Sequence, residues 1–277
     1  MRLPAEIIDI ILDYLHADIP ALRSAALTCK AWLASCRFHL FRRIVLSNRQ
    51  RLDQFGDVLC GNPLIASYVS HFWLQAGYED PHWLNEVPSC LPVDLFHEIK
   101  ALTLRIRSWS KMLRPPMQQI IYTQCTSVHT LLIDNTKFGD LHDFELLLDG
   151  LPMLRNLSMR GVTIGRHAMY FDDRRVTQTS VPVLHRLRLE IPAYSPWFLE
   201  WLMDKCDCSN LIELALLRMK TSDFPSTGLL LMRCSKSLQR LQLRWGPYVV
   251  DRTVAEIEAG TSTTHDIASL SNSDDHF

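Results

Sequence analysis

The stretch LHRLRL, residues 184–189, shows the pattern on which most of this chain is built. Its leucines Leu184, Leu187 and Leu189 follow the spacing apolar-x-x-apolar-x-apolar. Leu187 and Leu189 are two residues apart, so on a β-strand they point to one face while the arginine between them points to the other. The stretch therefore predicts a short strand that is buried on one face only.

The same spacing recurs seven more times, and the first positions of successive matches are 26 to 30 residues apart. A single match means little when 47% of the residues are hydrophobic, but even spacing indicates a structural repeat. The other matches begin at Phe41, Val69, Ile99, Val128, Leu154, Leu211 and Leu238. A period of this length around an L-x-x-L-x-L core resembles the leucine-rich repeat, which implies one strand and one helix per unit.

The expected fold class is therefore an α/β repeat. Residues 41–250 should form a degenerate leucine-rich-repeat solenoid, with a curved parallel sheet and helices on its convex side. Helices are expected at 51–60, 140–150, 197–206 and 228–234. Two connectors look irregular, because Arg114-Pro115-Pro116 should break a helix and residues 165–180 are polar with no clear period. Residues 260–277, rich in Thr, Ser and Asp, are expected to be a disordered tail.

Three short helices are expected before the first repeat. The first opens at Leu3-Pro4 and runs to about Leu15, a second opens at Asp18, and a third ends at Leu40-Phe41. On a helical projection an apolar arc of about 200° covers the first helix, whereas a helix that only covers its own core needs about 100°. The arc consists of Ile7, Ile8, Ile10, Ile11, Leu12, Tyr14 and Leu15. Three short helices cannot bury that much apolar surface among themselves, so the remaining face indicates a partner.

This region, residues 1–46, resembles an F-box, the helical trio that docks on the Skp-type adaptor of a cullin ubiquitin ligase. The resemblance rests on Leu3-Pro4, Glu6, the Ile/Leu series, Cys29-x-x-Trp32 and the close at Leu40-Phe41, where F-boxes often have Leu-Trp. The run from Leu3 to Leu46 resembles the F-box proteins abundant in mushroom-forming fungi. The resemblance implies adaptor contacts through Leu3, Pro4, Ile7, Ile8, Ile11, Leu12, Leu15, Leu22, Trp32 and Leu40. The alternative is an ordinary three-helix cap on a larger fold.

Composition excludes several other classes of protein. A net charge of −1 over 277 residues argues against nucleic-acid binding by bulk electrostatics. No apolar run approaches the length of about 20 residues that spans a bilayer, and the first residues are acidic and helix-forming too early for a signal peptide. We therefore expect a cytoplasmic or nuclear protein with no membrane and no nucleic-acid partner.

The eight cysteines fit structural positions better than chemical ones. Cys125, Cys208 and Cys234 each lie three or four residues before the first apolar position of a repeat, which predicts small buried side chains. Cys206-x-Cys208 is too tight for a usual zinc site. No local motif supports a Cys/His nucleophile, a phosphate loop or a carboxylate pair, so no catalytic residue, metal or cofactor is expected, and a hydrolase is disfavoured.

The residues that alternate with the buried leucines should line the concave side of the solenoid. They carry seven arginines against three acids, Asp134, Glu190 and Glu213, a formal charge of +4. The side chains expected to bind a target are Trp73, Arg105, Arg160, Arg186, Arg188, Arg240 and Arg244. Arg160, Arg186 and Arg188 should cluster with Glu190 as the only acid nearby, which predicts an acidic or phosphorylated target segment. The alternative is that the arginines only keep the sheet soluble.

Together with the resemblance, these patterns predict a substrate-receptor subunit of a cullin-type ubiquitin ligase rather than an enzyme. The F-box would bind the adaptor, and through it the cullin scaffold, while the repeats bind a target protein. Such a subunit acts by proximity, because it raises the effective concentration of target lysines near the ubiquitin thioester. The alternative function is a leucine-rich-repeat scaffold that binds a partner and has no ubiquitin role.

Overall fold

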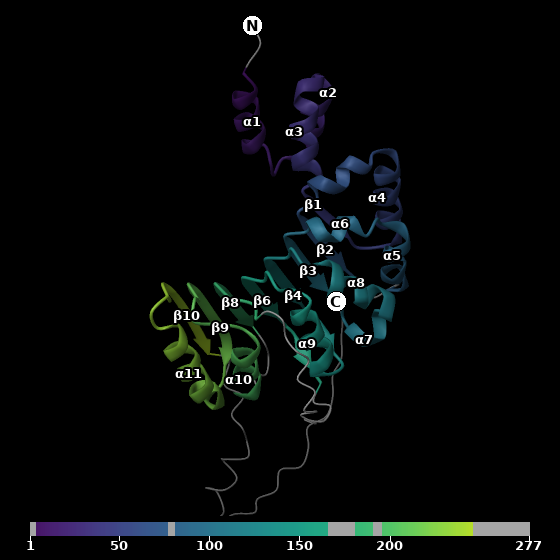
Figure 1. The fold of residues 1–277 in the computed structure, drawn as a ribbon. Coiled ribbons are helices and arrows are strands. Elements are labelled where there is room, and N and C mark those ends of the chain that lie inside the picture. The colour runs from purple at the N-terminus through teal and green to yellow at the C-terminus, as the bar shows by residue number, and fades with distance from the viewer. Residues whose placement is uncertain (1–3, 77–80, 166–180, 191–195, 246–277) are drawn as a thin grey trace, which may run out of the picture. The chain divides into compact units, whose positions relative to one another are not determined.

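The computed structural model describes residues 4–76, 81–165, 181–190 and 196–245, all of which fall in one compact unit. Its centre is a parallel sheet of eight strands in the order β1-β2-β3-β4-β6-β8-β9-β10 (Figure 1). These strands are β1 Arg43–Leu46, β2 His71–Gln75, β3 Ala101–Arg105, β4 Thr130–Asp134, β6 Asn156–Arg160, β8 Arg186–Glu190, β9 Glu213–Met219 and β10 Arg240–Trp245. All eight strands predicted from the spacing are confirmed, in sequence order.

Helices connect the strands, as a parallel sheet requires. Between them lie α4 Arg49–Gly61, η1 Pro63–Tyr68, η2 His82–Glu86, α5 Val87–Cys90, α6 Asp94–Glu98, α7 Trp109–Met112, α8 Pro115–Gln124, α9 Leu141–Asp149, α10 Pro196–Lys205, η3 Thr221–Asp223 and α11 Phe224–Cys234. Asn48 and Asp140 cap α4 and α9 by accepting hydrogen bonds from Arg51 N and Asp143 N, each at 2.9 Å. The four predicted helices are confirmed, although α11 begins earlier than expected.

The prolines at 115 and 116 do not interrupt a helix but begin one. Both lie in the first turn of α8, where the missing backbone N–H has no helical acceptor to lose. The short α7 ends at Met112, before these prolines. The strands β5 (Lys137–Phe138) and β7 (Thr163–Ile164) form a separate two-stranded parallel sheet. Most of the polar connector 165–180, and the predicted tail 260–277, lie outside the described residues.

The core lies on one face of the eight-stranded sheet. Equivalent leucines align from strand to strand, as in the pairs Leu131–Leu157 and Leu187–Leu214, and these four side chains are buried. Helical residues such as Leu147 complete the same cluster, and Figure 1 shows α9, α10 and α11 against one side of the sheet. Burying one such leucine stabilises the fold by about 1.5–3 kcal/mol, so the repeat spacing is itself the main source of stability.

The last strand departs from this pattern. Leu241 and Leu243, predicted to be buried, are 49% and 39% exposed. β10 is the edge strand of the sheet, and no described element packs over these two leucines beyond it. The prediction of burial is therefore wrong for the final unit within the described part of the chain.

The three cysteines predicted to be structural are buried, which confirms that prediction. Cys125, Cys208 and Cys234 are at most 1% exposed, and none of the eight cysteines forms a disulfide. Burial raises the pKa of Cys125 and Cys208 to about 12, so both stay protonated at neutral pH. These thiols pack as small side chains of the core.

Candidate functional site

The N-terminal helices α1 (Ala5–Tyr14), α2 (Ile19–Thr28) and α3 (Lys30–Phe41) form a trio with a core of its own. That core is small and consists of the buried side chains Ile8, Leu12, Leu22, Ala25 and Cys36. Two polar contacts also hold α1 against α3, from Ser35 Oγ to Asp9 Oδ1 at 2.6 Å and from His39 Nε2 to Asp13 Oδ1 at 3.2 Å. The position of α1 is therefore fixed from both its apolar and its polar side.

A second apolar face of α1 remains uncovered. Ile7, Ile10, Ile11 and Tyr14 are 43%, 53%, 39% and 87% exposed. Their spacing of three and four residues places them on one stripe along the helix. We call these four residues the α1 apolar face. An isolated exposed leucine or isoleucine is ordinary, but four in one stripe on a ten-residue helix indicate a contact surface.

The structure divides the residues expected to bind an adaptor into three groups. Ile7 and Ile11 belong to the α1 apolar face, and Pro4 is exposed beside it. Ile8, Leu12 and Leu22 are buried inside the trio, and Leu15, Trp32 and Leu40 pack around them. The assignment of Ile8, Leu12 and Leu22 to a contact surface is corrected, because these side chains hold the helices together. Leu3 lies outside the described residues.

Two exposed members of the stripe were on the predicted arc but not among the predicted contacts. Ile10 and Tyr14 are the most exposed residues of the α1 apolar face. Leu27 on α2, 88% exposed, is a further apolar side chain of the trio that sequence reasoning missed. Helical periodicity gives the width of the arc, but only the packing of α3 decides which part of it is covered.

The trio passes directly into the sheet. Arg42 alone separates α3 from β1, and its carbonyl accepts hydrogen bonds from Ser70 N at 3.0 Å and His71 N at 2.9 Å. Phe38 on α3 packs edge-to-face on Tyr68 of η1, with ring centroids 6.4 Å apart, and the Arg42 guanidinium lies 5.9 Å from the Phe38 ring centroid. The junction is thus a packed and hydrogen-bonded seam without a linker.

The second candidate surface is the sheet face that the helices leave free, here called the open face. Strand register sorts its side chains into three rows that run across the strands. The Glu213 row contains Arg43, His71, Ala101, Thr130, Asn156, Arg186, Glu213 and Arg240. The Arg188 row contains Val45, Trp73, Thr103, Leu132, Ser158, Arg188, Ala215 and Gln242. The Asp134 row contains Gln75, Arg105, Asp134, Arg160, Glu190, Leu217 and Arg244.

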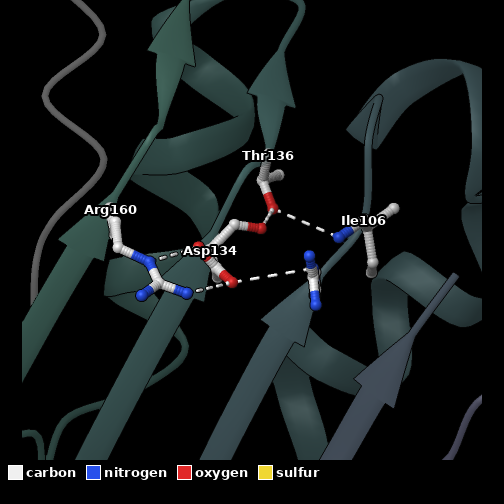
Figure 2. Close-up of polar contacts among 5 residues, drawn as sticks. Ile106, Asp134, Thr136 and Arg160 are labelled. Atoms are coloured by element: carbon white, nitrogen blue, oxygen red, sulfur yellow. Dashed lines mark hydrogen bonds and ion pairs between the residues drawn. The ribbon is translucent and has the colours of Figure 1, made fainter. Parts of the chain in front are cut away.

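Asp134 organises its row (Figure 2). Its two carboxylate oxygens accept hydrogen bonds from Arg160 Nε and Nη2, both at 2.8 Å, and Arg105 Nε lies 3.6 Å away on the other side. The hydrogen bond from Arg160 and the charges of Arg160 and Arg105 hold the pKa of Asp134 below its usual value. Thr136 Oγ1 donates to the Asp134 carbonyl at 3.1 Å and accepts from Ile106 N at 3.2 Å, which fixes the backbone behind the carboxylate.

Glu213 has the same role in its own row. Its carboxylate lies 3.4 Å from Arg186 Nε and forms a second ion pair with Arg240 Nη2. Nearer the first strand of the row, burial and the charges of Arg42 and Arg43 lower the pKa of His71, which favours its neutral form. The positive charge of the Glu213 row is therefore partly neutralised where Glu213 pairs with Arg186 and Arg240.

These pairs correct the predicted cluster of three arginines. Glu190 is not the only acid nearby, because Asp134 is paired with Arg160 and Glu213 with Arg186. Asp134, expected on the surface, is only 5% exposed. The predicted target-binding residues Arg105, Arg160, Arg186, Arg188, Arg240 and Arg244 are all exposed on the open face, and Trp73 is partly exposed there. Of the three clustered arginines, Arg188 has no carboxylate partner among the described residues.

Comparisons with known proteins give no name for either surface. No family model matches the chain, and no curated protein matches it. None of the helices in the described ranges has the length and apolarity to cross a bilayer. Within the same ranges, no group of three or more His, Cys, Asp or Glu side chains is arranged to hold a metal ion. The α1 apolar face and the open face are the two candidate functional surfaces.

Proposed function

We propose that this protein is the substrate-receptor subunit of a cullin-type ubiquitin ligase. In this proposal the helical trio is an F-box that binds a Skp-type adaptor, and the sheet with its helices is a leucine-rich-repeat solenoid that binds a target protein. The proposal is supported by two exposed surfaces of different character on one compact unit. One is apolar and belongs to a helix, and the other is charged and belongs to a sheet.

The observation that carries the proposal is the α1 apolar face. The trio buries Ile8 and Leu12 on α3 and leaves Ile7, Ile10 and Ile11 outward, so α1 has two apolar faces and only one of them is used. Full burial of such a side chain contributes about 1.5–3 kcal/mol, and four of them offer several kcal/mol to a partner that covers the stripe. A helix that packs between its own trio and an adaptor requires this arrangement.

The junction between the two surfaces supports the proposed mechanism. A receptor subunit performs no chemistry, but it must hold the target in a fixed place relative to the adaptor. The hydrogen bonds from Ser70 and His71 to Arg42, and the packing of Phe38 on Tyr68, couple the trio to the first strands without a linker. A target bound to the sheet would then be held near the ubiquitin-carrying enzyme at the other end of the cullin.

Affinity purification of the tagged chain from cells, followed by mass spectrometry, tests this function. Wild-type protein should recover both a Skp-type adaptor and a cullin. The Ile11→Asp variant places a charge in the α1 apolar face and should lose both, because an unpaired charge in a desolvated contact is costly. Met232→Asp is the matched control, since Met232 is 67% exposed on α11, away from the trio, and should leave recovery unchanged.

The same experiment separates the proposal from its alternative. A leucine-rich-repeat scaffold without a ubiquitin role would recover other partners but neither adaptor nor cullin from wild-type protein. Recovery of both by a folded Ile11→Asp variant would also contradict the proposal, because the α1 apolar face would then not be the contact. Circular dichroism of each variant shows whether the trio is still helical.

A further inference from the structure

The Arg188 row changes character halfway across the sheet. In β1 to β4 its members are Val45, Trp73, Thr103 and Leu132, which are partly exposed and mostly apolar. In β6 and β8 they are Ser158 and then Arg188. A ligand that follows this row therefore meets an apolar surface first and a guanidinium group after it.

The arginines closest to Arg188 in the neighbouring rows do not compete for the same ligand group, because carboxylates pair with them. Arg160 is held by two hydrogen bonds to Asp134, and Arg186 and Arg240 both pair with Glu213. These pairs lie on the two sides of Arg188, one row toward each end of the strands. They keep positive charge near the centre of the face, while the Arg188 guanidinium has no carboxylate partner among the described residues.

Arg188 is the member of this central group that is free to bind an anion. It is exposed, and no ion pair or hydrogen bond joins its side chain to any described residue. Its row neighbours Ser158 and Ala215 are small and uncharged. A guanidinium in such a setting can offer its planar N–H groups to a carboxylate or phosphate in a bidentate contact.

We propose that the open face binds an extended protein segment in which two apolar side chains are followed by one anionic side chain at a fixed spacing. This inference rests on the proposed function, for which it defines the target. The anionic group would bind Arg188, one apolar side chain would contact Leu132, and the second would contact Trp73. Because Asp134 and Glu213 neutralise the arginines on either side of Arg188, the segment should combine apolar residues with one anionic residue rather than be acidic throughout.

Strand geometry sets the spacing of the motif. Parallel strands are about 4.8 Å apart, so Leu132 and Arg188, two strands apart in register, are separated by about 10 Å. Trp73 is two strands further, at about 19 Å from Arg188. A segment in the extended polyproline II conformation advances about 3.1 Å per residue and returns to the same side every three residues. The anionic residue should therefore lie about three positions from one apolar residue and about six from the other, with all three side chains facing the sheet.

The composition of the row favours a protein segment over a nucleic acid. A polynucleotide presents a charge at every residue and would need a track of free cations. Among the described residues, the Arg188 row offers one guanidinium without a carboxylate partner beside Val45, Trp73 and Leu132, and the flanking Arg160 and Arg186 are paired. Apolar side chains next to a single anion match this pattern, and a protein segment supplies both.

The test uses the purified full chain and a displayed library of random peptides long enough to cross these strands. Selection should enrich peptides with an acidic residue about three positions from one apolar residue and about six from another. Arg188→Glu should weaken the best synthetic peptide by about tenfold or more in fluorescence anisotropy, the loss expected for a charge-assisted contact. Leu132→Asn should also weaken it, while Arg51→Glu, the same charge change on exposed α4, should not.

Peptide variants identify the anion and complete the test. Replacing the acidic residue by its amide should abolish the effect of Arg188→Glu, and phosphoserine at that position shows whether phosphate binds more tightly than carboxylate. Failure to enrich the spaced motif, or binding that ignores both Arg188→Glu and Leu132→Asn in variants with wild-type melting temperatures, would overturn the inference. Adaptor binding, measured on the same variants, reports on the proposed function separately, because it depends on α1.

Discussion

Replacing Asp134 by asparagine tests whether the open face is held together by the ion pairs described above. The amide keeps the shape of the carboxylate but removes its charge. It can accept from Arg160 through one oxygen only, and its NH2 group then faces a guanidinium. Arg105, at 3.6 Å on the other side, loses its counter-charge as well. The variant should therefore be less stable than wild type and should leave two arginines free.

The expected size of the effect follows from the geometry. Hydrogen bonds to charged groups contribute about 1.5–3 kcal/mol, and the two bonds from Arg160 at 2.8 Å are well formed. The side chains of Arg160 and Arg105 are 60% and 46% exposed, so solvent screens part of this energy. We expect a loss of about 1–2 kcal/mol, which lowers the melting temperature by about 2–8 °C in a protein of this size.

The effect should also depend on pH with a definite sign. The pKa of Asp134 is lowered in the folded protein from its ordinary 3.8. The carboxylate therefore adds stability that is complete well above pH 3.8 and is lost as the pH falls through the lower folded value. The difference in melting temperature between wild type and Asp134→Asn should be largest near neutral pH and should shrink in acid.

Thermal unfolding followed by circular dichroism, at neutral and at acid pH, measures both effects. Arg188→Gln is the control, because replacing an exposed arginine that pairs with no described residue should change stability by no more than about 0.5 kcal/mol. The double variant Asp134→Asn/Arg160→Gln should be less destabilised than the sum of the single variants. Equal melting temperatures of wild type and Asp134→Asn at neutral pH would refute the reasoning, as would a difference that persists unchanged in acid.

Two further predictions concern the core. Thiol reagents should label Cys125, Cys208 and Cys234 slowly in native protein and rapidly in denaturant. The exposed Cys29 and Cys60 should react at once in native protein. Rapid native labelling of the three buried cysteines would show that they are not core residues. Gly150→Ala should lower the melting temperature strongly, because its Cβ would lie 2.2 Å from the Tyr122 carbonyl oxygen. Gly228→Ala has open space around it inside α11 and should stabilise the protein by about 0.5–1 kcal/mol. The opposite order of melting temperatures would contradict the described packing of α8 and α9.

The strands could be predicted from the sequence because their signal is a short pattern that repeats. Two apolar residues separated by one position, as in Leu187 and Leu189, mark a candidate strand face, and the even spacing of eight such matches identifies the strands. The same pattern predicted burial of Leu241 and Leu243 and was wrong there, because burial also needs an element on top of the strand. The prolines 115 and 116 mark the start of a helix rather than a break for a similar reason, since their effect depends on position within the helix.

The charged contacts could not be predicted, because they depend on register between distant residues. Asp134 and Arg160 are 26 positions apart and meet only when β4 and β6 pair as they do. A one-residue shift of β6 would move Arg160 to the other face of the sheet. The total charge of the open face can be counted from the sequence, but only strand pairing shows that Arg160 and Arg186 pair with carboxylates, whereas Arg188 has no carboxylate partner in the described part of the chain.

The division of α1 into two apolar faces could be predicted only in part from the sequence. The predicted arc contained every residue of the α1 apolar face, including Ile10 and Tyr14. Which part of the arc is covered depends on how α3 packs, and the contacts of Asp9 with Ser35 and of Asp13 with His39 set that packing. An arc wider than the helix needs for its own core therefore predicted an uncovered apolar face, which the structure confirms, but it did not identify which residues form that face. The partner itself stays a prediction.

The central claim is that the α1 apolar face binds a Skp-type adaptor, and the most direct test is the dissociation constant between purified chain and purified adaptor. Isothermal titration calorimetry should give tight binding for wild type and for Met232→Asp. Ile11→Asp should weaken binding by about a hundredfold or more, as expected when a charge is placed in a buried contact. Undiminished binding by a folded Ile11→Asp variant, or no binding by the wild type, would contradict the account.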